Sequence, residues 1–183
     1  MTIPRTASPS ARSRCTALVM GLVAAALPLS SVAAQDAGPD ALTEVYRDWT
    51  VRCATPDGGE RRCWMTQVVN QTETGERILQ IEIALSDDGP LLAFLTPFGL
   101  HLPSGLDIAI DEGTVRTLAF RTCLPRGCLI EERPDEEELS AMRRGQTMSV
   151  TMVAAQNENA VNMELSLSGF SAAYNRLSAL RQS

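Results

Sequence analysis

Short segments of alternating apolar and polar residues recur along most of this chain, and they leave few architectures open. The clearest are RILQIEIAL at 77–85, TMSVTMV at 147–153 and AVNMELSLSGF at 160–170. Turn-forming Gly, Pro, Asp and Asn residues separate such segments at intervals of roughly 8 to 15 residues. Side chains that alternate with a period of two line opposite faces of a β-strand. The pattern therefore predicts an all-β fold, an antiparallel β-sandwich or barrel, with one or two short helices.

The first 34 residues have the composition of a secretory signal peptide. Three arginines and no acidic residue precede the apolar run at 15–29, and small residues follow at Val32 and Ala34. This order predicts cleavage between Ala34 and Gln35. An uncleaved membrane anchor is the alternative, but the apolar run is shorter than the roughly 20 residues that a spanning helix needs.

The expected mature chain consists of a flexible N-terminus at residues 35–44 and a single β domain at residues 45–183. All 22 acidic residues but only 13 of the 16 basic residues lie after residue 34, so the mature net charge is −9. A nucleic-acid-binding protein needs a basic surface to neutralise phosphates, so this charge argues against DNA and RNA as partners. No segment after the signal peptide is apolar over a length that predicts a transmembrane span.

Four cysteines remain after the expected cleavage, and they fall in two close pairs. Cys53 and Cys63 enclose the turn sequence ATPDGGERR, while Cys123 and Cys128 enclose LPRG. An even number of cysteines in an exported chain implies disulfides. Four cysteines allow three pairings, and the local pairing 53–63 and 123–128 fits two disulfide-stapled hairpins.

A redox centre and a metal site both fit these residues less well. Thiol oxidoreductases place two residues between their cysteines at a helix N-terminus, whereas four residues separate Cys123 from Cys128 and the flanks resemble strands. Zinc needs several nitrogen or thiolate ligands, and the one histidine, His101, stands in GLHLPSG without a second candidate ligand nearby. We therefore expect no cofactor and no metal, and a structural or exposed role for His101.

One internal segment has helical character. In RPDEEELSAMRRG, Asp135 can cap the helix N-terminus, and Glu138 follows three positions later. Glutamates occupy the positive end of the helix dipole, arginines occupy the negative end, and Gly145 suits the C-terminal stop. A calcium loop would space its carboxylates at alternate positions, so a helix start is the better interpretation of the acidic run. A second short helix is predicted by helical spacing near the C-terminus, at Ala173, Leu177 and Leu180.

The most apolar stretch of the expected mature chain is LLAFLTPFGLHLPSG, residues 91–105. Pro97 and Pro103 predict a short strand, a bend and a second extended piece. We expect this run to lie in the core; if it were exposed, it would form an apolar patch of the kind that marks interfaces. The candidate partner contacts are Phe94, Phe98 and Leu100, together with Arg121 and Arg126 beside the second cysteine pair.

Catalytic residues are not evident in the sequence. It contains no Gly-x-Ser-x-Gly elbow and no Gly-rich phosphate-binding loop. We therefore do not expect an enzyme. Two carboxylates brought together from distant loops stay open as the enzymatic alternative.

Several segments also stand in an order that is typical of one known family. They are DWTVRC, RRCWMTQVV, LTPFGLHLPSGLDIAIDEG, LAFRTCLPRGCLIE and LSLSGFSAAYNRL, which extend over roughly residues 45–180. Together they resemble the invasion-associated locus B family of exported bacterial proteins. The resemblance implies a periplasmic, secreted or outer-envelope location, and it favours a disulfide role for the four cysteines.

The resemblance supplies no catalytic residues. It implies a non-enzymatic function, the binding of a protein or cell-surface partner, with host-cell interaction in invasive relatives. A structural or stress-related periplasmic protein is the alternative.

Overall fold

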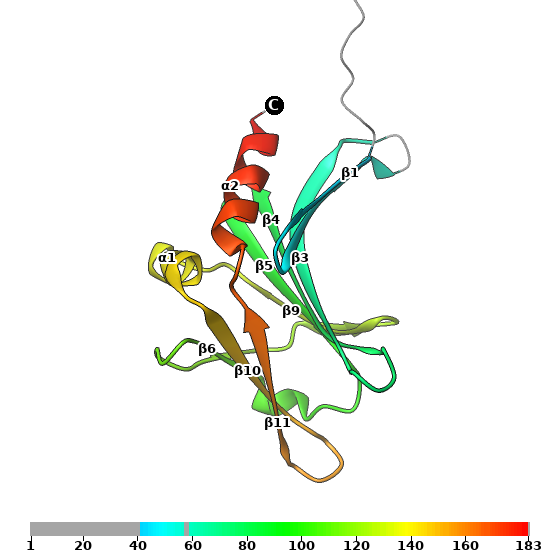
Figure 1. Cartoon of the computed structure of the whole chain (residues 1–183). Helices are drawn as coiled ribbons and strands as arrows, with labels where there is room; N and C mark the ends of the chain where they lie inside the picture. Colours follow the sequence, from blue (N-terminus) through cyan, green and yellow to red (C-terminus); the bar gives the residue numbers. More distant parts are fainter. Residues whose placement is uncertain (1–40, 57–58, 183) are drawn as a thin grey trace, which may run out of the picture. The chain divides into compact units, whose positions relative to one another are not determined.

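The computed structural model describes residues 41–56 and 59–182, which form two antiparallel sheets and two α-helices (Figure 1). The seven-stranded sheet has the order β1-β2-β3-β4-β5-β9-β8. Its strands are β1 (Ala41–Tyr46), β2 (Trp49–Ala54), β3 (Arg62–Asn70), β4 (Arg77–Ser86), β5 (Gly89–Thr96), β8 (Thr122–Leu124) and β9 (Gly127–Glu132). The four-stranded sheet, in the order β11-β10-β6-β7, consists of β6 (Leu106–Ile110), β7 (Arg116–Leu118), β10 (Thr147–Val153) and β11 (Ala160–Ser166). The helices are α1 (Glu136–Arg144), α2 (Phe170–Arg181) and the 3₁₀ turn η2 (Leu102–Ser104).

The two sheets share one apolar core, so the fold is a β-sandwich and the predicted fold class is confirmed. The seven-stranded sheet contributes alternate residues of its strands, such as Met65 and Ile83, and the four-stranded sheet contributes residues such as Val150 and Leu165. All four are fully buried. Each such side chain contributes about 1.5–3 kcal/mol to folding, so the alternation read from the sequence is also the main source of stability.

Helix α2 lies against strands β1 to β4 on the core side of the seven-stranded sheet (Figure 1). Its apolar side, with Phe170, Ala173 and Leu177, is part of the core. Phe170 meets Trp49 edge to face, with ring centroids 5.0 Å apart. The C-terminal helix predicted from helical spacing is therefore confirmed, and it completes the core at this end of the sandwich.

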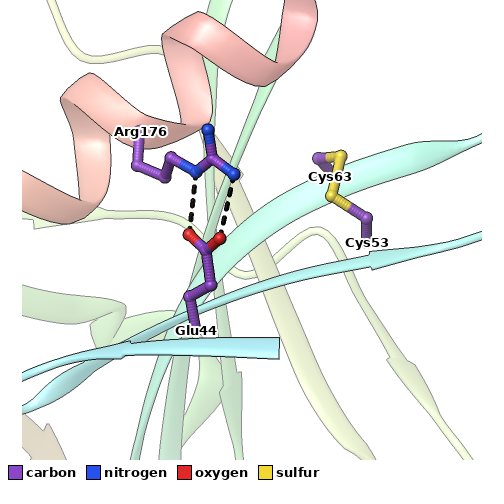
Figure 2. Close-up of a disulfide and its surroundings, with 4 residues drawn as sticks. All are labelled: Glu44, Cys53, Cys63 and Arg176. Carbon is purple, nitrogen blue, oxygen red and sulfur yellow. Dashed lines mark hydrogen bonds and ion pairs between the residues drawn. A yellow bond between two sulfur atoms is a disulfide. The ribbon is translucent and has the colours of Figure 1, made fainter. Parts of the chain in front are cut away.

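Both predicted disulfides are present, and each joins two residues that face each other across a hairpin. Cys53 pairs with Cys63 in the β2–β3 ladder, and Cys123 pairs with Cys128 in the β8–β9 ladder. Figure 2 shows the first of them as a bond between neighbouring strands. In the chain-entropy model such short loops contribute on the order of 2–3 kcal/mol each.

The predicted helix at 136–144 begins as its capping signal requires. The Asp135 carboxylate accepts a hydrogen bond from the Glu138 backbone N–H at 2.8 Å. The helix ends at Gly145 as predicted. Its φ angle of −71° is not the left-handed conformation in which a glycine usually ends a helix. A Cβ at this position would lie 2.7 Å from the Ile110 side chain, so the position requires glycine for space.

Three boundaries differ from the sequence prediction. Residues 41–44, expected to be flexible, belong to β1, which pairs with β2 along its whole length. The segment TVRTLAFRTC at 114–123, which the sequence predicts as one strand, contains β7 and the start of β8, and these belong to different sheets because the chain crosses the sandwich between them. Residues 102–104, expected to be extended, form η2. The predicted signal peptide at residues 1–34 and the predicted flexible segment at 35–40 lie outside the described residues.

Strand β1 is attached to α2 by an ion pair that the sequence did not suggest. Figure 2 shows the Arg176 guanidinium donating two hydrogen bonds to the Glu44 carboxylate, at 2.8 and 2.9 Å. The Tyr46 hydroxyl donates a third, at 2.8 Å. The Arg176 bonds, with a smaller contribution from Tyr46, hold the pKa of Glu44 below its ordinary value.

This ion pair predicts a pH-dependent contribution to stability. Because the pKa of Glu44 is lower in the folded state, its stabilisation is complete above the unfolded pKa of about 4.3 and is lost as the pH falls through the folded pKa. We therefore expect Glu44→Gln to be less stable than wild type at pH 7, and we expect this difference to shrink toward pH 3. Urea unfolding across this range measures it, with the exposed Glu73→Gln as control. A difference that does not change with pH would contradict the assignment.

Candidate interaction surface

The β5–β6 connection presents an exposed aromatic side chain. β5 ends at Thr96, directly opposite Cys128 of β9, and the chain then turns through Pro97 to Phe98. Phe98 is 59% exposed. Gly99 follows with a φ angle of +85°, a left-handed conformation that favours glycine.

Backbone hydrogen bonds to the end of β10 hold this turn in place. The Ala155 N–H donates to the Gly99 carbonyl, and the His101 N–H donates to the Val153 carbonyl, both at 2.8 Å. Leu100 forms a β-bridge with Ala154 between these bonds. Phe98 is thus presented on a fixed turn, so little conformational entropy would be lost when a partner covers it.

The tip of the β8–β9 hairpin lies beside the end of β5. The turn Pro125–Arg126 joins the two strands, and Gly127 approaches β5 so closely that a Cβ would lie 2.2 Å from the Thr96 carbonyl oxygen. Arg126 is exposed at this tip, and Leu124 is 46% exposed. We use the term Phe98 surface for Phe98, Leu124 and Arg126.

The five candidate contacts do not all reach this surface. Phe94 is wrong as a surface contact, because its position in β5 directs it into the core, where it is completely buried. Leu100 is half-buried against the core, and the Arg121 guanidinium forms an ion pair with Glu131. Phe98 and Arg126 are exposed. The role of these four residues as partner contacts stays a prediction.

Sequence reasoning missed Leu124, although a signal for it was present. Strand alternation places Leu124 on the opposite side of β8 from Cys123, and Cys123 is directed toward its disulfide partner. An apolar residue just before a hairpin turn therefore had to point away from the disulfide. The core interpretation of residues 91–105 is right for Phe94 and does not hold for Phe98.

Away from the Phe98 surface, several carboxylates line a groove of about 450 Å³ between α1 and the β6–β7 connection. Asp135, Glu137 and Glu138 line it together with Arg116. Burial raises the pKa of Glu138, although the nearby Arg116 opposes the shift. Glu138 and Glu132 both accept hydrogen bonds from Arg116, and Asp135 caps α1. These contacts have a structural role, because they hold α1 against β7 and β9.

Residues 41–56 and 59–182 contain no cluster of three or more His, Cys, Asp or Glu side chains that could hold a metal ion. This part of the chain also contains no helix whose length and apolarity would suit a bilayer-spanning segment. His101 instead takes part in a local hydrogen bond, in which its Nδ1 lies 2.8 Å from the Ser104 hydroxyl oxygen.

These features define a class of protein: a β-sandwich with two cross-strand disulfides, a C-terminal helix in its core and an exposed aromatic turn. The family model of the invasion associated locus B (IalB) protein matches residues 49–178. The chain belongs to this family, and the resemblance read from the sequence is confirmed.

Named relatives cover nearly all of this chain. An invasion protein B homolog of Brucella abortus is 36% identical over 166 residues, which are 88% of this chain and 95% of the relative. Invasion protein B of Bartonella bacilliformis is 31% identical over 156 residues, 83% of each chain. The crystal structure of invasion associated protein B from Bartonella henselae is similar to this chain, with a TM-score of 0.69 and 29% sequence identity. The match covers 77% of this chain and 97% of the Bartonella henselae chain.

Proposed function

We propose that this chain is an exported, non-enzymatic protein of the periplasm or outer envelope that binds a protein or cell-surface partner through the Phe98 surface. The single observation that carries the proposal is Phe98 itself, an aromatic side chain 59% exposed on a turn held by backbone hydrogen bonds. Exposed aromatic side chains on fixed elements are typical centres of binding interfaces.

The surroundings of Phe98 support the same function. Leu124 adds apolar area, and the Arg126 guanidinium adds a positive charge at the tip of a hairpin that the Cys123–Cys128 bond closes. Aromatic residues and arginine are enriched at interfaces. Export is supported by the signal-peptide pattern and by the two disulfides, which persist in oxidising compartments. The names of the relatives concern invasion, and host-cell contact by this chain is part of the proposal.

Site-specific photo-crosslinking in intact cells tests this function. A photo-reactive phenylalanine analogue replaces Phe98 in one strain and Val115 in another; Val115 is 61% exposed in the β6–β7 connection and serves as the matched control. We expect a defined crosslinked product from position 98 and none from position 115. The product should disappear when Arg126→Glu is added, because the partner loses its contact with the positive charge.

Two results would contradict the proposal. The first is the absence of any product from position 98, which would favour the structural or stress-related alternative. The second is the same set of products from positions 98 and 115, which would indicate random collisions.

A further inference from the structure

A hollow of about 580 Å³ lies between the end of α2, the start of β3 and the end of β4. At this end of the sandwich α2 lies against β1 to β4, and the four-stranded sheet lies toward the other end (Figure 1). A helix is about 10 Å across, whereas four strands spaced by about 4.8 Å are wider, so one helix leaves part of the sheet uncovered. The volume of the hollow is typical of ligand pockets.

Aliphatic side chains form the floor of the hollow. Leu177 is 1% exposed, and Leu85 and Leu180 are half-buried against the core. None of the described lining residues is aromatic, and none carries a neutral hydrogen-bonding side chain. Nucleobases and other planar polar ligands are held by aromatic stacking and by precisely placed polar groups. This floor suits a flexible aliphatic chain instead.

The polar part of the lining is charged, and most of its charges are positive. Arg61, Arg62 and Arg181 line the hollow together with one carboxylate, that of Glu60. Arg181 also forms an ion pair at 2.7 Å with Asp87, whose side chain is fully exposed. Three guanidinium groups against these two carboxylates leave one excess positive charge, which matches the single charge of a carboxylate ligand.

Arg61 and Arg62 have no side-chain partner among the described residues. Neither guanidinium group forms a hydrogen bond or an ion pair there, although the chain as a whole has a net charge of −6. Guanidinium groups bind carboxylates through paired hydrogen bonds. The disulfide of Cys63 fixes the start of β3 two residues after Arg61, so less conformational entropy is lost when a ligand binds there.

We propose that this hollow binds one long-chain carboxylate, a fatty-acid anion. Its aliphatic chain lies on Leu85, Leu177 and Leu180, and its carboxylate accepts hydrogen bonds from Arg61. An anionic membrane surface fits less well, because it repels a protein of negative net charge at distances where a few arginines have little effect.

The hollow is separate from the Phe98 surface. Leu85 is paired with Pro90 at the start of β5, whereas Phe98 follows the end of β5. The two sites therefore lie at opposite ends of this strand. Fatty-acid binding goes beyond the proposed partner binding and does not depend on it.

Isothermal titration calorimetry of the purified, disulfide-bonded protein with dodecanoate tests the site. We expect one dodecanoate per chain with a Kd of about 100 μM or lower. Dodecyltrimethylammonium has the same chain and the opposite charge, and it should bind at least about tenfold more weakly. Acetate, which lacks the chain, should not bind in this range. Vesicles of phosphatidylglycerol should not retain the protein in a sedimentation assay.

Two variants test the assigned contacts. Arg61→Glu should weaken dodecanoate binding at least about tenfold. Its control, Arg52→Glu, changes an exposed arginine of β2 outside the lining and should bind like wild type. Leu180→Glu places a charge on the floor and should also weaken binding, while Val115→Glu adds the same charge at an exposed residue elsewhere. Circular dichroism verifies that each variant is folded.

Four results would overturn the proposal. The first is the absence of dodecanoate binding at about 1 mM. The second is wild-type affinity in Arg61→Glu. The third is equal affinity for dodecanoate and dodecyltrimethylammonium, which would indicate an unspecific apolar contact. The fourth is retention by phosphatidylglycerol vesicles without dodecanoate binding, which would assign the arginines to a membrane surface.

Discussion

Gly169→Ala is expected to lower the free energy of unfolding by at least about 4 kcal/mol, the size of effect that requires a specific structural cause. Gly169 precedes α2 with a φ angle of +91°. A Cβ there would lie 1.9 Å from the Tyr46 carbonyl oxygen and 2.8 Å from its carbon. Both are backbone atoms of the last residue of β1, so no side-chain rotation relieves the overlap, and α2 would have to leave its place on the sheet.

Gly75→Ala is the matched control for this substitution. Gly75 also has a left-handed backbone, with a φ angle of +71°, but a Cβ there would meet nothing within 4 Å. We expect a loss of about 1 kcal/mol from the conformation alone. Urea unfolding of both variants separates the cost of the φ angle from the cost of the close approach. Equal losses in the two variants would show that the contact with Tyr46 does not matter.

Trp49→Ala is expected to lower the free energy of unfolding by about 3–5 kcal/mol. Trp49 is completely buried, packs edge to face on Phe170, and donates from Nε1 to the Ser166 carbonyl at 3.0 Å. It therefore connects β2 with the end of β11 and with α2. Its removal would leave a cavity where these three elements meet.

Gln67 limits the cost of losing the hydrogen bond between Trp49 and the Ser166 carbonyl, because Gln67 also donates to this carbonyl. Its amide donates to the same Ser166 carbonyl at 2.9 Å and accepts from the Ser166 N–H at 3.1 Å. The carbonyl of Ser166 thus keeps a donor in Trp49→Phe, for which we expect a loss of less than half of that in Trp49→Ala.

The second tryptophan provides the matched control for Trp49→Ala. Trp64 is partly exposed on the outward face of β3, so Trp64→Ala should cost only about 1 kcal/mol. Urea unfolding of the three variants at low protein concentration makes the comparison. Equal losses for Trp49→Ala and Trp64→Ala would contradict the assignment of Trp49 to the core.

Only part of the Phe98 surface could be predicted from the sequence. The sequence predicts that the apolar run 91–105 lies in the core, with an exposed contact patch as the alternative, but alternation alone could not decide between Phe94 and Phe98. The decision depends on where β5 ends: Phe94 lies in a strand that is covered on its core side, and Phe98 lies beyond Pro97 where no sheet covers it.

The sequence by itself determined the features that depend on neighbours along the chain. The two hairpin disulfides, the capped helix α1, most strands and the C-terminal helix all follow from turns, caps and periodicity within about a dozen residues. Only the tertiary structure decided the rest: that residues 41–44 form an edge strand held by Arg176, that β7 and β8 separate into two sheets, and that Gly169 must be glycine. Each of these depends on atoms more than 100 residues away or on the opposite layer, and no local pattern in the chain carries that information.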